Sequence, residues 1–196
     1  MIFNNYICTY NKCTCGNKIW KCDRFKKIKS QYKTLLKLRF EDSCAYCQRA
    51  LTHDENIVID LEHVLPKREY KKYTFTLNNL VISCRRCNTP PRKGTRKDFI
   101  VNNHLGTRYN ISDFYPENYK FIHPNLEDVT QYYELILLQK GRKKFLRYDL
   151  KKWHPKRAYT LDFFMLKEIE IGSLDSYAGI NHDIQSRLDK GIPNKF

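Results

Sequence analysis

The chain has 196 residues, which suffices for one domain with an elaboration or for two small domains. Apolar residues make up 41% and aromatic residues 14% of the sequence, so the composition predicts a packed core and excludes a disordered chain. The formal net charge of +15 exceeds what solubility requires and favours a polyanionic partner, most simply nucleic acid, over a solvated basic surface.

The sequence contains no long apolar run. Its longest purely aliphatic piece is LILL, far shorter than the roughly 20 residues that a membrane-spanning helix needs. The first residues, MIFNNYICTYNKC, lack the basic start, apolar centre and small-residue cleavage site of a signal peptide. We therefore expect a cytoplasmic protein that makes no membrane contact.

The first 23 residues are polar and hold four cysteines whose spacing matches no familiar metal-binding pattern. A second zinc site and free cysteines in a small packed extension both remain open, and we favour the second interpretation. These cysteines are Cys8, Cys13, Cys15 and Cys22.

Residues 24–42 are expected to form an amphipathic helix, because apolar side chains recur at spacings of three to four residues. The residues that carry this pattern are Ile28, Tyr32, Leu35, Leu36 and Phe40. The segment NIVIDLE, residues 56–62, is short and β-branched and predicts a strand. A second strand is expected at NLVISC, after a basic loop over residues 64–78 that contains tyrosines.

The later part of the chain is expected to begin with a β-hairpin. Residues 132–149 alternate as two strands that turn at Lys140-Gly141. Residues 158–170, AYTLDFFMLKEIE, fit either a helix or a strand.

Two CxxC pairs stand 36 residues apart in the middle of the sequence. A short turn can direct both sulfurs of such a pair at one ion, so two pairs predict a tetrahedral four-thiolate zinc site. Four thiolates leave no open coordination position, which gives this zinc a structural role. Its ligands would be Cys44, Cys47, Cys84 and Cys87.

Between the two pairs lies LEHVLPK, in which Glu62 directly precedes His63. A histidine can abstract a proton near neutral pH, and a carboxylate can hold a hard divalent cation. Phosphodiester hydrolysis uses both kinds of group. Asn79 and Asn88, at the two ends of the segment NLVISCRRCN, could each supply an amide oxygen to a metal or to a histidine N–H.

The motifs CAYC, DLEHVLP, NLVISCRRCN and RKG occur in the order of the HNH endonucleases, and residues 40–98 resemble the zinc-bearing branch of that family. The resemblance implies a ββα-metal fold. It also implies that His63 is the general base, that Glu62 and Asn88 ligate a catalytic Mg²⁺ or Mn²⁺, and that Asn79 holds the loop and orients His63.

The sequence departs from the family pattern in two places. Its first motif position is Glu, where Asp or His is common. The segment TPPRKG follows Asn88, so the motif helix is expected to begin at Pro91 or later, or to be a single turn.

A weaker resemblance links residues 119–170 to the HNH subunit of Septu and retron antiphage systems, and it implies a partner ATPase. His123, in FIHPNLED, is interpreted as structural. The basic runs PRKGTRK and KGRKKFLRYDLKKWHPKR could contact phosphates or form solvated faces.

The combined prediction is an α+β protein with an HNH core, an N-terminal helix and a C-terminal α/β elaboration. Its regions would be a cysteine-rich extension at 1–23, a nuclease domain at 24–105 and a hairpin and helix region at 106–196. The predicted function is a metal-dependent endonuclease that cuts DNA as an antiphage effector. The alternatives are an RNA-cleaving effector and a catalytically inactive zinc-stabilised binding or adaptor protein.

Overall fold

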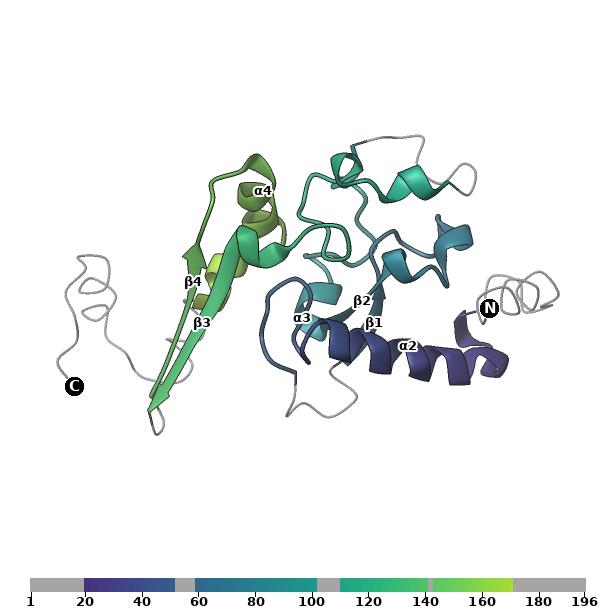
Figure 1. The fold of residues 1–196 in the computed structure, drawn as a ribbon, viewed down its shortest axis with the longest axis horizontal. Coiled ribbons are helices and arrows are strands. Elements are labelled where there is room, and N and C mark those ends of the chain that lie inside the picture. Colours follow the sequence, from purple (N-terminus) through teal and green to yellow (C-terminus); the bar gives the residue numbers. More distant parts are fainter. Residues whose placement is uncertain (1–19, 52–58, 102–109, 141–142, 171–196) are drawn as a thin grey trace.

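The structure is a computed structural model that describes residues 20–51, 59–101, 110–140 and 143–170 (Figure 1). Helices and strands are mixed, as the predicted α+β class requires. None of the helices in these ranges has the length and apolar character to span a bilayer. Cys8, Cys13 and Cys15 lie outside the described residues, so the prediction for the N-terminal cysteines is not addressed.

The expected amphipathic helix is present. A 3₁₀ turn, η2 (Asp23–Phe25), leads into α2 (Lys26–Arg39). The buried face of α2 consists of Ile28, Tyr32 and Leu36, as the spacing predicted. Leu35 departs from the prediction, since it is 54% exposed.

Two antiparallel strands lie against α2 (Figure 1). They are β1 (Ile59–His63) and β2 (Leu80–Cys84), close to the positions that the sequence predicted. Every residue of β2 is buried, which fits its run of apolar side chains. The register pairs Glu62 with Val81, so the acidic residue and the histidine end β1 beside the start of β2.

The single turn α3 (Arg85–Asn88) follows β2 directly. Of the two expectations for the motif helix, the single turn agrees with α3, and the start at Pro91 or later is wrong, because residues 89–101 contain no helix. Within this segment the chain reverses, and the amides of Lys93 and Gly94 donate to the carbonyls of Cys87 and Asn88 at 3.1 Å each. This reversal fixes the surroundings of Glu62.

The second hairpin, β3 (Tyr133–Lys140) and β4 (Lys143–Leu150), confirms the prediction over residues 132–149. It forms a long ribbon whose turn end extends away from the rest of the chain (Figure 1). The ambiguous segment after it is helical, as α4 (Pro155–Phe163). Pro155 occupies the first turn of α4, and the His154 side chain accepts from the Lys156 amide as its N-cap.

Candidate metal centre and histidine site

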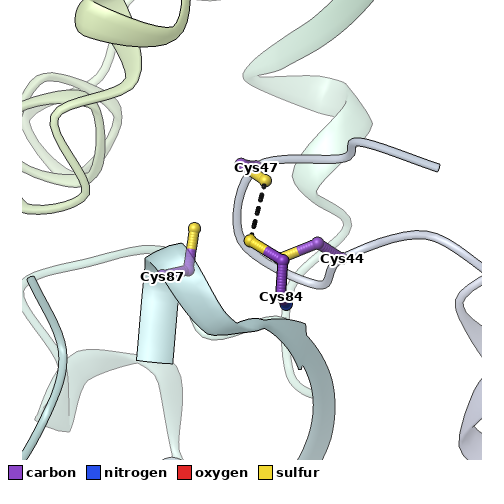
Figure 2. A group of neighbouring side chains, drawn as sticks. All are labelled: Cys44, Cys47, Cys84 and Cys87. Carbon is purple, nitrogen blue, oxygen red and sulfur yellow. Dashed lines mark hydrogen bonds between the residues drawn. The ribbon is translucent and has the colours of Figure 1, made fainter. Parts of the chain in front are cut away.

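Four buried cysteines converge where the first helix and the second strand end (Figure 2). Cys44 and Cys47 lie on the tight turn after α2, Cys84 ends β2, and Cys87 lies on α3. Their sulfurs all lie within 4.8 Å of one another. The sequence spacing predicted this grouping.

The sulfur geometry fits a tetrahedral metal ion such as zinc. Zn–S bonds of about 2.3 Å place tetrahedral sulfurs about 3.8 Å apart. The Cys47 and Cys84 sulfurs lie 3.7 Å apart. Around them, the Cys84 amide donates to the Cys44 sulfur at 3.3 Å, and Arg49 donates to the Cys84 sulfur at 3.6 Å. These donors would offset part of the negative charge of four thiolates.

The thiols differ in their readiness to ionise. Hydrogen bonding with Cys44 lowers the pKa of Cys47 and of Cys84, whereas burial raises the pKa of Cys44. The pKa of Cys87 is raised by hydrogen bonding with its three sulfur neighbours. Without a metal ion, the pKa is therefore lowered for two of the thiols and raised for the other two. A bound cation would favour the thiolate at all four positions.

The cysteine turn is also the surface on which the second hairpin packs. The Tyr133 hydroxyl donates to the Tyr46 carbonyl at 2.7 Å, and the Tyr148 hydroxyl donates to the Cys47 carbonyl at 2.8 Å. Gln48 bonds twice to β3, to the Tyr133 carbonyl at 3.1 Å and from the Leu135 amide at 2.7 Å. The turn that carries Cys44 and Cys47 thus joins the β1–β2 hairpin to the β3–β4 hairpin.

His63 ends β1 and is only 3% exposed. Its Nε2 lies 3.0 Å from the Thr74 carbonyl, and a carbonyl can only accept, so Nε2 carries the proton and Nδ1 is the basic nitrogen. Burial, with a contribution from the positive charge of Lys67, lowers the pKa of His63 to about 3. The ring is therefore neutral at physiological pH, and Trp20 packs edge-on against it with ring centroids 4.4 Å apart.

Asn79 lies beside this loop and is fully buried. Its Oδ1 accepts from the Leu65 amide at 2.6 Å, and its Nδ2 donates to the carbonyls of Leu65 and Tyr73. Tyr73 precedes Thr74, whose carbonyl holds His63. Asn79 thus fixes both ends of the loop that orients the histidine ring, without touching the ring itself.

Glu62 does not face an open cation position in this structure. Its Oε1 lies 2.9 Å from Nζ of Lys93, whose side chain is fully buried. Burial raises the pKa of Glu62 and lowers the pKa of Lys93, while each group acts in the opposite sense on its partner. The short contact between the two groups identifies an ion pair.

Asn88 is engaged elsewhere. Its Nδ2 donates to Oδ2 of Asp60 at 2.8 Å, and Asp60 lies two residues before Glu62 on the same face of β1. The two residues expected to share a divalent ion are thus bound to different partners. In the described conformation Glu62 is paired with Lys93, and Asn88 is paired with Asp60.

The sequence interpretation missed two residues of this site. Lys93 belongs to the run PRKGTRK, which was interpreted as a phosphate-contacting or solvated segment, yet it is buried beneath Glu62. The same run is largely paired, since Arg92 contacts Glu168 and Arg96 contacts Asp98. Trp20 carried no signal, because an isolated tryptophan is most simply a core residue.

His123, the other histidine considered, is buried away from this site. Its Nδ1 accepts from the Asn125 amide at 3.2 Å, and its ring packs edge-on against Tyr119. Burial lowers its pKa to about 3. The surroundings agree with the structural interpretation of this residue.

Comparison with known proteins gives one informative relationship. No protein-family model matches the chain. Over 98 residues, the sequence is 33% identical to Septu protein PtuB of Bacillus thuringiensis. The aligned stretch covers 48% of this chain and 34% of that relative, so the chain spans about a third of the protein that it matches. This chain is therefore similar, over about half of its length, to a Septu protein.

Proposed function

We propose that this protein is an HNH-type nuclease that hydrolyses phosphodiester bonds, with DNA as the favoured substrate, as an effector of antiphage defence. His63 would act as the general base. The similarity to a Septu protein supports the defence role, and a partner protein, an ATPase by the sequence resemblance, belongs to the same proposal. The hydrolytic activity itself is inferred from the histidine site.

The observation that carries this proposal is the way His63 is held. Donation from Nε2 to the Thr74 carbonyl fixes the ring and leaves Nδ1 as a proton acceptor, which is what activation of a water molecule requires. A general base works best with a pKa near the working pH, and the buried ring is far below it. An approaching phosphate anion would raise that pKa, because a nearby negative charge favours the imidazolium.

The surface around this histidine suits a polyanion. The loop after β1 exposes Lys67, Arg68, Lys71 and Lys72. Lys67 is close enough to influence His63 electrostatically, and its Nζ lies 6.0 Å from the centre of the Trp20 ring. Basic side chains of this kind bind phosphates without reading sequence. A nucleic-acid substrate would thus be attracted to the loop that holds His63. Because Trp20 packs against the His63 ring, Trp20 would have to move before the substrate could reach that ring.

The direct test is cleavage of supercoiled plasmid by the purified protein, with its partner present, beside His63→Ala and His154→Ala. We expect His63→Ala to lower the cleavage rate by about 100-fold or more, the usual size of a general-base effect. His154→Ala removes the cap of α4 and should cost about 1 kcal/mol of stability without changing cleavage. Equal rates for wild type and His63→Ala would refute the role of His63.

A second function is supported by the closed state of the site. Glu62 is bound by a buried lysine, and His63 is shielded from solvent, as in a protein that binds nucleic acid without cutting it. Under this alternative the wild type would bind plasmid tightly and cleave neither DNA nor RNA with any divalent metal or partner. The same assay, run with both substrates, therefore also separates an RNA-cleaving effector from the DNA nuclease.

A further inference from the structure

We propose that Lys93 is a resident cation that competes with divalent metal ions for the Glu62 carboxylate. The role of this competition in regulating a nuclease rests on the proposed function. The competition itself concerns cation binding and can be measured without cleavage. The sequence predicts that Glu62 and Asn88 bind a divalent ion, whereas in the structure Glu62 forms an ion pair with Lys93.

The ammonium group of Lys93 is enclosed by oxygen atoms. Its Nζ lies 2.9 Å from Oε1 of Glu62, 3.0 Å from the His63 carbonyl and 3.4 Å from the Gly94 carbonyl. The lysine side chain is 0% exposed, and Glu62 is only 8% exposed. An ammonium has three N–H donors, so each donor has an oxygen acceptor here. The position is therefore a complete cation site made of carboxylate and carbonyl oxygens.

Backbone hydrogen bonds hold the segment that carries Lys93 in place. The Lys93 amide is tied to the Cys87 carbonyl, and the Gly94 amide is tied to the Asn88 carbonyl. Gly94 has φ +42°, and a Cβ at that position would lie 3.0 Å from Cγ of Pro90. Both the positive φ and the close approach of Pro90 favour glycine at this position, and the reversal that Gly94 allows places Lys93 beside Glu62.

The chemistry of the acceptors makes the two cations alternatives. Carboxylate and carbonyl oxygens are also the ligands that Mg²⁺ and Mn²⁺ take. A divalent ion and an ammonium on one buried carboxylate would repel each other strongly, because the surrounding dielectric constant is low. A metal ion can therefore bind Glu62 only when Lys93 withdraws. Asp60, on the same face of β1 as Glu62, and Asn88 of α3, which is hydrogen-bonded to Asp60, would be the other candidate ligands.

The test measures Mn²⁺ binding by electron paramagnetic resonance on zinc-loaded full-length protein. The variants are Lys93→Met, which removes the charge at similar length, and Lys93→Met/Glu62→Gln, which also neutralises the carboxylate. We expect Lys93→Met to bind Mn²⁺ at least 10-fold more tightly than wild type, and the double variant to lose that gain. Equal Mn²⁺ affinity in wild type and Lys93→Met would overturn the proposal, whether that affinity is high or absent.

A second measurement uses only folded wild-type protein, because Lys93→Met leaves a buried carboxylate unpaired and can unfold. Acetylation of Lys93 by an N-hydroxysuccinimide ester is followed by mass spectrometry with and without saturating Mg²⁺. Displacement predicts that Mg²⁺ speeds acetylation of Lys93 at least several-fold and leaves the exposed Lys97 unchanged. No effect of Mg²⁺ on Lys93 would contradict competition. Neither readout requires cleavage, so a protein that competes for cations but cuts nothing would refute only the proposed nuclease activity.

Discussion

His123 is the clearest source of pH dependence at the level of single residues. Its side chain is fully buried, and burial lowers its pKa from an ordinary value of 6.5 to about 3, with Lys156 and Arg39 acting in the same direction. Below pH 6.5 the unfolded chain therefore takes up a proton that the folded protein refuses. Stability falls as the pH falls from about 6.5 towards 3.

We expect one histidine of this kind to contribute a slope of about 1.4 kcal/mol per pH unit to the free energy of unfolding between pH 6 and pH 5. His123→Asn removes the titrating group and keeps an acceptor for the Asn125 amide. Urea unfolding at closely spaced pH values should therefore give a shallower slope for the variant. An unchanged slope would mean that His123 is protonated in the folded protein.

Lys93 shows where sequence reasoning stops at the residue scale. Adjacent Glu62 and His63 could be singled out because their chemistry is local to one motif. Lys93 lies 31 residues from Glu62, and its partner depends on how the chain reverses between Asn88 and Gly94. Two prolines and a glycine indicate that a helix will not continue, but they do not indicate which side chain the reversal brings inside.

The cysteine cluster is the element that couples the two hairpins. It closes the end of β2, and its turn accepts hydrogen bonds from Tyr133 and Tyr148 on the second hairpin. The CxxC spacing could predict the cluster, because each pair is a local turn. The docking of the hairpin on that turn could not be predicted, since it depends on tyrosine hydroxyls some 87 and 101 residues away along the chain.

A metal ion held by the four cysteines should stabilise both hairpins, so its removal should weaken both together. Structural zinc binds to peptides with an apparent free energy on the order of 10 kcal/mol, so Cys44→Ser should lower the free energy of unfolding by several kcal/mol. Each kcal/mol corresponds to about 2–4 °C in Tm for a chain of this size. Calorimetry, with metal content measured in parallel, checks the loss.

The matched control is Cys22→Ser, since Cys22 lies outside the four-cysteine cluster. It should retain one tightly held zinc per chain and shift Tm far less than Cys44→Ser. A Cys44→Ser protein that keeps the wild-type Tm, or a wild-type protein that holds no metal after dialysis, would contradict a structural zinc at this cluster.

The positive net charge is a property of the whole molecule, but the positions of the basic side chains determine where a polyanion can bind. The net charge of +15 predicts attraction to a polyanion and does not say where the contact lies. Some exposed basic side chains have a carboxylate partner within the protein, and others lie on the loop beside His63. On α2, Lys26 and Lys37 pair with Asp23 and Asp42. On the loop beside His63, Lys67 and Arg68 are exposed.

This difference predicts unequal effects from two double variants that each remove two positive charges. Each phosphate contact contributes about −0.9 to the slope of log K against log salt concentration on duplex DNA. Lys67→Gln/Arg68→Gln should reduce the magnitude of that slope by about 2. Lys26→Gln/Lys37→Gln should change it by much less, because those lysines already have carboxylate partners. His63→Ala should keep the wild-type slope, since a neutral ring releases no counterions.

Fluorescence anisotropy with a labelled duplex between 50 and 200 mM NaCl measures all four proteins under the same conditions, and circular dichroism confirms that each is folded. If the two double variants lowered the slope equally, DNA would respond to net charge alone, and the loop beside His63 would not be its binding surface. A slope near zero for wild type would remove nucleic acid as the partner. A loss confined to Lys67→Gln/Arg68→Gln would instead place the phosphate backbone next to the histidine that is proposed to act on it.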